Sequence, residues 1–107
     1  MLTQRSKIKE IIDSYKDSLR TLGIRTQRVI LFGSYARGKQ KVHSDIDLLI
    51  ISNDFRYMNL RNRLEVLGVA AVRIMQPIEA KGYTQAELKK ASPVNFLGEA
   101  LATGITL

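Results

Sequence analysis

Two aspartates separated by one residue are the clearest chemical feature of this 107-residue sequence. Asp45 and Asp47 lie in SDIDLLI, an apolar and β-branched segment that predicts a strand over residues 45–52. Because side chains alternate along a strand, both carboxylates lie on the same face. Two like charges resist ionising together unless a cation lies between them, and oxygen ligands of this kind suit Mg²⁺ or Mn²⁺. The pair predicts a divalent-cation site.

A glycine-rich loop precedes the paired aspartates and follows another predicted strand, residues 28–32. Gly33 and Ser34 stand where free backbone N–H groups and a hydroxyl can hold phosphate oxygens, and a glycine lets the backbone come close. Arg37 and Lys39 add positive charge. Each of these residues taken singly fits a turn or a surface ion pair, but their coincidence with the paired aspartates favours a phosphate site.

Several other kinds of site are excluded by composition and motif. The sequence has no Cys and one His, His43, so disulfides, zinc ribbons, iron–sulfur clusters and histidine-rich metal sites are ruled out. Gln40 follows Gly38-Lys39, so the ending of a Walker loop is missing, and no G-x-G-x-x-G or G-x-S-x-G is present.

The segment GSYARGKQKVHSDIDLLI resembles the signature of the DNA polymerase β-like nucleotidyltransferase superfamily, and most closely its minimal nucleotidyltransferase (MNT) branch. Gly33-Ser34, a ten-residue spacer and the two aspartates keep the spacing of that signature. The resemblance implies a short mixed β-sheet, ATP or another nucleoside triphosphate as donor, and two Mg²⁺ ions, with Mn²⁺ as a substitute. It also implies a transferase that moves a nucleoside monophosphate to a hydroxyl.

The resemblance assigns roles residue by residue. It implies two metal-ligating, catalytic aspartates and a third carboxylate on a later strand, for which Glu79 is the candidate although the family more often has Asp there. Glu79 would also position or deprotonate the acceptor hydroxyl; the competing interpretation is an exposed charge on an edge strand. The donor-binding residues implied are Gly33, Ser34, Arg37 and Ser44, and the catalytic metal ligands are Asp45, Asp47 and Glu79.

The elements that must position these residues follow from periodicity and capping signals. Apolar residues at helical spacing predict helices over residues 6–22 and 59–75, and the second should cover the sheet with Leu60, Leu64, Leu67, Ala71 and Ile74. A third short strand is expected over residues 78–80. Thr84 to Glu87 has the spacing of a capping box, and Ser92-Pro93 is typical of a helix start, so two short helices follow. We predict an α/β (α+β) fold, a short mixed sheet flanked by helices in one domain, residues 1–107.

Charge is unevenly distributed along the chain, whose net charge is +7. Residues 1–43 carry ten basic and three acidic side chains, whereas residues 44–107 carry seven of each. We therefore expect residues 1–43 to bind an anionic ligand or partner. A triphosphate near Arg37 explains some of the excess positive charge. The longest apolar run, residues 66–72, is too short to span a bilayer, so we expect a cytoplasmic protein.

Partners are inferred from the resemblance and from length. The 107 residues leave no room for an acceptor domain, so we expect another protein as the acceptor. Minimal family members are often antitoxins that adenylylate a small helical HEPN toxin, which makes such a toxin the expected partner. The alternative is a non-catalytic antitoxin or basic nucleic-acid binder that acts by occlusion. Self-association stays open, and transfer to a small molecule is disfavoured without a further helical domain.

Overall fold

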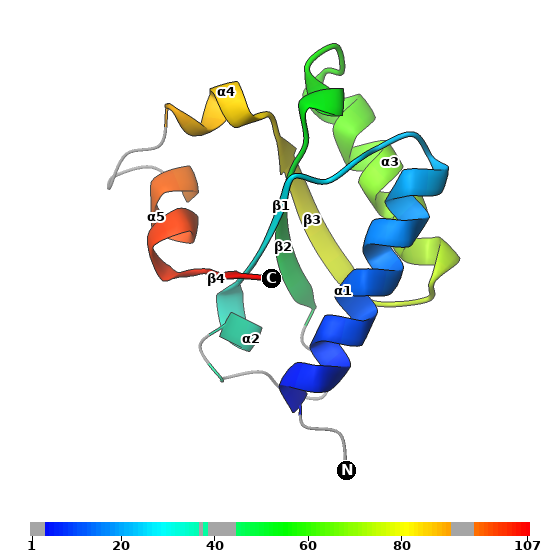
Figure 1. The fold of residues 1–107 in the computed structure, drawn as a ribbon, viewed down its shortest axis with the longest axis vertical. Helices are drawn as coiled ribbons and strands as arrows, with labels where there is room; N and C mark the ends of the chain where they lie inside the picture. Colours follow the sequence, from blue (N-terminus) through cyan, green and yellow to red (C-terminus); the bar gives the residue numbers. More distant parts are fainter. Residues whose placement is uncertain (1–3, 37, 39–44, 91–95) are drawn as a thin grey trace.

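The fold is a four-stranded mixed β-sheet with helices on both faces (Figure 1). A computed structural model describes residues 4–36, 38, 45–90 and 96–107. The helical elements are α1 (Gln4–Thr21), α2 (Gly33–Ala36), the 3₁₀ turn η1 (Asn53–Phe55), α3 (Leu60–Arg73), α4 (Gln85–Leu88) and α5 (Phe96–Thr103). The strands are β1 (Arg28–Phe32), β2 (Ile46–Ile51), β3 (Ile78–Tyr83) and β4 (Ile105–Thr106).

The sheet has the strand order β3-β2-β1-β4. β1 runs antiparallel to both β2 and β4, while β2 and β3 are parallel. The end of β1 and the starts of β2 and β3 therefore meet at the same edge of the sheet. This topology confirms the predicted mixed sheet flanked by helices, and it brings the glycine loop, the two aspartates and the third strand to one edge.

The two faces of the sheet are covered by different helices. Alternate residues of β2, namely Ile46, Leu48 and Ile50, pack in the larger core beneath α1 and α3. Leu49 faces the opposite way and packs in a smaller core with Leu97 of α5. Both strands of the central pair are thus buried on both faces, as their continuous apolar sequences predict.

Two buried hydroxyl groups join α1 to α3. The Tyr15 hydroxyl donates a hydrogen bond to the backbone carbonyl of Leu67, and the Ser18 hydroxyl donates one to that of Ala70. Both donor–acceptor distances are 2.9 Å. Because buried polar groups are costly without partners, these bonds satisfy the two hydroxyls and fix the register between the helices. Burial raises the pKa of Tyr15 well above its usual value, so the hydroxyl stays protonated as the donor.

The predicted orientation of α3 is partly wrong. Its sheet-facing residues include Leu67 and Ala71, as predicted, together with Ala70. Leu60 and Leu64, predicted to cover the sheet, are 68% and 56% exposed. The helix has apolar residues on two faces, and the inner face runs through Leu67, Ala70 and Ala71.

Arg63 is a buried cation on the same helix that ties four elements together. Its guanidinium donates to the backbone carbonyls of Met58, Phe55 and Gly82 at 2.9–3.1 Å. It also forms an ion pair of 2.8 Å with Glu87, whose carboxylate completes the predicted capping box with Thr84. Partial burial alone would raise the pKa of Glu87, but the bonds from Arg63 and Thr84 lower it below its usual value.

We expect Arg63→Met to lower the free energy of unfolding by about 3 kcal/mol, because it strands three carbonyls and a carboxylate. Arg61→Met is the control, since the ion pair of Arg61 with Glu65 is exposed and should contribute less than about 1 kcal/mol. Urea unfolding of the two variants measures the difference. The stabilisation from Glu87 is present above its unfolded-state pKa and is lost as pH falls through the lower folded-state value, so the Arg63→Met deficit should shrink in acid. Equal losses in both variants would contradict this role.

The remaining predicted elements differ mainly at their ends. The strand expected over residues 28–32 is present with these ends, and the helix expected over 6–22 and the strand over 45–52 are present with ends shifted by one or two residues. The third strand extends to Tyr83 instead of ending at residue 80, and β4 was not predicted. Ser92-Pro93 lies outside the described residues, and α5 begins at Phe96. Within the described residues, none of the helices combines the length and apolar character needed to cross a membrane.

Candidate functional site

Gly33 and Asp47 are in direct contact at the edge of the sheet. Gly33 directly follows β1 and begins α2 with φ +72°, a left-handed conformation that favours glycine. A Cβ added at Gly33 would overlap Oδ2 of Asp47 and lie 3.0 Å from its Cγ, so only a residue without a side chain fits beside this carboxylate. Two separate features therefore require glycine at this position: the left-handed backbone conformation and the lack of space for a side chain next to the Asp47 carboxylate.

Register places Glu79 next to Asp47. β2 and β3 run parallel with Asp47 opposite Glu79, so the two side chains project from the same face of the sheet. This is the face that also carries Leu49 and α5. Asp45 lies two residues before Asp47 and is exposed, and Glu79 is exposed as well. The three acidic residues singled out in the sequence are therefore neighbours at one edge.

The charges of the neighbouring residues act on Asp47. Partial burial raises the pKa of Asp47, and the negative charges of Glu79 and Asp45 raise it further. Lys81, two residues beyond Glu79 on the same face of β3, acts in the opposite direction. Sequence reasoning missed Lys81, although its period-two spacing from Glu79 is a signal that could have found it.

The other donor-binding residues of the sequence prediction are less fully placed. The backbone of Ser34 lies in α2, directly after Gly33. Arg37 and Ser44 lie outside the described residues, as do His43 and Lys39. Their assignment stays a prediction.

Metal binding by the acidic residues has chemical but not geometric support. Three carboxylates provide the oxygen ligands that Mg²⁺ prefers, and a cation would relieve the repulsion that raises the pKa of Asp47. Yet among the described residues no three His, Cys, Asp or Glu side chains converge closely enough to hold one ion. The donor set fits a divalent cation, and Glu79 as a third ligand stays a prediction.

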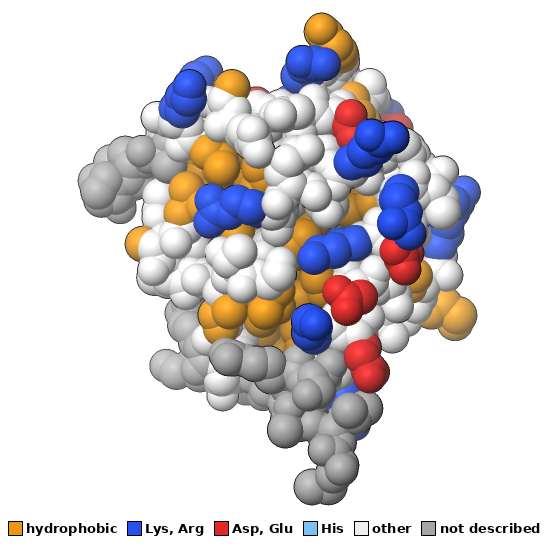
Figure 2. All heavy atoms as spheres, viewed as in Figure 1, with side chains coloured by type: hydrophobic (Ala, Val, Ile, Leu, Met, Phe, Trp, Pro, Cys, Tyr) orange, Lys and Arg blue, Asp and Glu red, His pale blue; other side chains and the backbone are white. Residues whose placement is uncertain are grey.

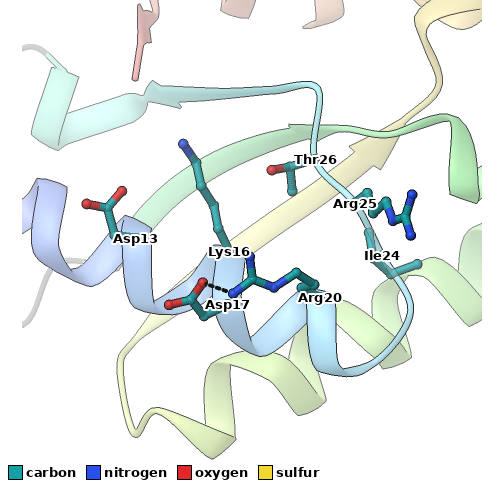
Figure 3. Close-up of a pocket in the computed structure, with 7 residues that line it drawn as sticks. All are labelled: Asp13, Lys16, Asp17, Arg20, Ile24, Arg25 and Thr26. Carbon is teal, nitrogen blue, oxygen red and sulfur yellow. Dashed lines mark hydrogen bonds and ion pairs between the residues drawn. The ribbon is translucent and has the colours of Figure 1, made fainter.

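A cavity of about 420 Å³ lies elsewhere, between the second half of α1 and the loop that leads to β1 (Figure 3). Acidic and basic side chains alternate around it, and Arg20 pairs with Asp17 at 2.7 Å. None of the predicted site residues lines this cavity, so its volume does not locate the nucleotide site. Its lining residues are Asp13, Lys16, Asp17, Arg20, Ile24, Arg25 and Thr26.

The basic side chains visible on one face of the molecule do not form a single block (Figure 2). They are dispersed, and several stand beside acidic ones. Lys16 and Arg20 of α1, for example, line the cavity together with Asp13 and Asp17. Basic and acidic side chains are therefore interspersed on this face.

Three relatives are similar to parts of this chain. Two proteins of Methanocaldococcus jannaschii, each named "Putative protein adenylyltransferase", are 41% and 37% identical over 58 and 62 residues. These matches cover 53% and 58% of this chain, and 55% and 61% of the relatives. A third protein of that name and organism is 38% identical over 61% of this chain and 65% of its own. The chain thus spans only about half to two thirds of the curated relatives it matches.

Solved structures and a family model extend the similarity over most of the chain. A "toxin-antitoxin with AMP-PNP" crystal structure is 25% identical with a TM-score of 0.61, covering 88% of this chain and 69% of that one. A "putative nucleotidyltransferase from Sulfolobus solfataricus", 19% identical with a TM-score of 0.56, covers 99% and 89% and shares the fold. The family model described as "Nucleotidyltransferase domain" matches residues 8–97, which include the glycine loop and all three acidic residues. The chain therefore belongs to the nucleotidyltransferase domain family.

Proposed function

We propose that this chain transfers AMP from ATP to a hydroxyl group of a partner protein, with Mg²⁺, and thereby acts as an antitoxin. The observation that carries the proposal is the contact of Gly33 with Asp47, at the edge where Asp45 and Glu79 also lie. A backbone that approaches a carboxylate this closely can hold a triphosphate beside it. Family membership and the "Putative protein adenylyltransferase" relatives support the type of reaction.

The proposed reaction is an in-line displacement at phosphorus. The oxygen of the acceptor hydroxyl attacks the α-phosphorus of ATP, the bond to the bridging oxygen of the β-phosphate breaks, and pyrophosphate leaves. Glu79 is exposed beside Asp47, where its carboxylate can orient the acceptor hydroxyl and accept its proton. Gly33 and Ser34 hold the β- and γ-phosphates through the start of the loop.

Asp45 and Asp47 would hold the Mg²⁺, with Glu79 as the third ligand. The bound cation would supply charge neutralisation for the triphosphate and the leaving pyrophosphate. Without a cation, partial burial and then the negative charges of Glu79 and Asp45 raise the pKa of Asp47, so the arrangement disfavours its ionised form. An arrangement that disfavours its own ionised form is suited to binding a cation.

A toxin is the partner favoured by the structural similarity. The neighbour with a TM-score of 0.61 is a toxin–antitoxin assembly with a nucleotide analogue. Combined with the resemblance of GSYARG and SDIDLLI to minimal nucleotidyltransferases, this favours a small helical toxin of the HEPN type as acceptor. Glu79 and Lys81 project from the sheet face on which such an acceptor would meet the site.

The test is transfer of label to a co-expressed helical toxin encoded beside this protein. With Mg²⁺ and ATP labelled at the α-phosphate, we expect the toxin to become labelled; with ATP labelled at the γ-phosphate, we expect none. Intact-mass measurement of the toxin should show the gain of AMP. No transfer from any nucleoside triphosphate, in Mg²⁺ or Mn²⁺, would overturn the proposal.

Two variants of the acidic site distinguish catalytic transfer from neutralisation by occlusion alone. If Asp45→Asn and Asp47→Asn still bind and neutralise the toxin fully, occlusion explains neutralisation. We expect instead that both variants bind the toxin and leave it active. Binding to duplex DNA that weakens steeply with salt would favour the nucleic-acid alternative.

A further inference from the structure

The exposed large apolar side chains of the described residues lie in one short segment. They are Tyr57, Leu60, Leu64, Val69, Val72 and Met75, and all belong to α3 or its immediate flanks. Val72 and Met75 are 74% and 88% exposed. Because α3 already buries a separate face in the core, this outer face does not contribute to the fold of one chain.

Four of these residues, together with Gly68, form one line along the helix and just beyond its end. Successive i, i+4 residues lie on one ridge of a helix, and here they fall at Leu60, Leu64, Gly68 and Val72, continued by Met75 just beyond the end. We call this set the outer stripe. Gly68 is at its centre, and a Cβ built there would meet no atom within 4 Å.

Met75 is held in an unusual backbone conformation. Its φ is +55°, a left-handed value at the end of α3 where glycine or asparagine is ordinarily found. A residue with a side chain pays about 1–2 kcal/mol for this conformation. A large, almost fully exposed apolar side chain at such a position is explained if the side chain contacts something outside this chain.

The outer stripe is matched to itself when two copies are antiparallel. Leu64 and Val72 lie four residues before and after Gly68, while Leu60 lies eight before and Met75 seven after. A two-fold axis through Gly68 therefore places Leu64 of one copy against Val72 of the other, twice over. Without a side chain at the crossing point, the two backbones can approach closely.

A hollow beside the stripe fits the same arrangement. It has a volume of about 230 Å³. Its wall toward α3 is formed by Leu60, Arg63 and Leu64, and its wall toward β3 by Lys81, Gly82 and Tyr83. The antiparallel arrangement brings Met75 of the second copy to this end of the stripe. Methionine is flexible and fills irregular apolar gaps well.

We propose that this protein forms a two-fold symmetric dimer in which the outer stripes of two α3 helices pack antiparallel, crossing at Gly68. A stable interface buries about 800 Å² on each partner, and side chains that are half to nine tenths exposed provide its apolar centre. Asp47 and Glu79 project from the opposite face of the sheet, and Lys81, which lines the hollow, stands at the boundary between the interface and that face. The inference does not depend on the proposed function.

Mass measurement by light scattering or sedimentation equilibrium tests the dimer over a range of concentrations. We expect a dimer for the unmodified chain, and at least about a 100-fold higher dissociation constant for the double variant Leu64→Lys, Val72→Lys, since buried unpaired charges oppose association. The double variant Gln85→Lys, Ala102→Lys adds the same charge at exposed positions elsewhere and should remain dimeric. A monomer at all concentrations, including one that associates only with another protein, would overturn the proposal.

Cysteine cross-linking tests the geometry, because the chain has no Cys of its own. Gly68→Cys should form a disulfide-linked dimer on mild oxidation, since the two-fold axis places residue 68 beside its own copy. Leu64→Cys and Val72→Cys should cross-link poorly alone but efficiently when mixed. Lys9→Cys, exposed on α1, is the control for random collisions. Cross-links of residue 64 to itself and residue 72 to itself would show a parallel arrangement and contradict the model.

Discussion

Asp47→Asn should reduce nucleotidyl transfer by at least about 10³-fold while leaving the folded chain as stable as before, or more stable. In the proposed site Asp47 is a ligand of the cation that would neutralise the charge of the triphosphate, so its loss removes that stabilisation of the transition state. The substitution removes a carboxylate whose ionised form is disfavoured in the folded chain. For this reason the free energy of unfolding should not decrease. Burial raises its pKa, and the charges of Glu79 and Asp45 raise it further. Transfer of labelled AMP and urea unfolding without metal measure the two effects.

The pH dependence of that stability difference has a definite sign. For a carboxyl group whose folded-state pKa is raised, the penalty is present above the folded-state pKa and vanishes below the unfolded-state pKa. The advantage of Asp47→Asn over the unmodified chain should therefore be largest near neutral pH and disappear in acid. Asp13→Asn, on the exposed side of α1, is the control and should change neither activity nor stability appreciably. A variant that transfers AMP normally would remove Asp47 from the proposed site.

Local sequence was enough to predict the central elements and the paired aspartates. The strand period of two predicts Asp45 and Asp47 on one face, and in the structure β2 begins at Ile46, directly after Asp45. The position of Glu79 beside them depends on parallel pairing of β2 with β3, which is not a local property. The resemblance and its place on a predicted strand single out Glu79, and the observed register places it opposite Asp47, while its role stays a prediction.

Long-range contacts explain what the sequence did not indicate. β4 is only two residues long and exists because Ile105 and Thr106 pair with Leu31 and Ile30 of β1. The extension of β3 through Gly82 depends on pairing with Ile50 and on the Phe55 ring, which lies 2.6 Å from where a Cβ would be. Neither of these long-range contacts can be predicted from the β-propensities of the residues involved.

The orientation of α3 shows a different limit. Apolar residues recur at spacings of three and four on two faces, so periodicity identifies a helix but does not say which face is buried. The hydroxyls of Tyr15 and Ser18 bond to the carbonyls of Leu67 and Ala70, which places these residues inward. Leu64 is consequently turned outward.

Gly33→Ala should lower transfer activity by about 100-fold or more and also destabilise the fold. A side chain at φ +72° costs about 1–2 kcal/mol, and the added methyl group would overlap the carboxylate of Asp47. Asp47 is short and its backbone is fixed in β2, so its carboxylate must rotate away. A displacement of about 1 Å in a catalytic group is enough for a 100-fold loss.

Gly23→Ala separates the two causes, because it has the backbone cost without the overlap. Gly23 ends α1 with φ +90°, and a Cβ there would meet no atom within 4 Å. It lies far along the chain from the acidic residues, so we expect a loss of about 1–2 kcal/mol in the free energy of unfolding with activity retained. The excess loss of stability in Gly33→Ala then measures the overlap with Asp47, and the loss of activity measures how far the carboxylate has moved. Equal behaviour of the two variants would mean that the close approach of Gly33 to Asp47 has no part in catalysis.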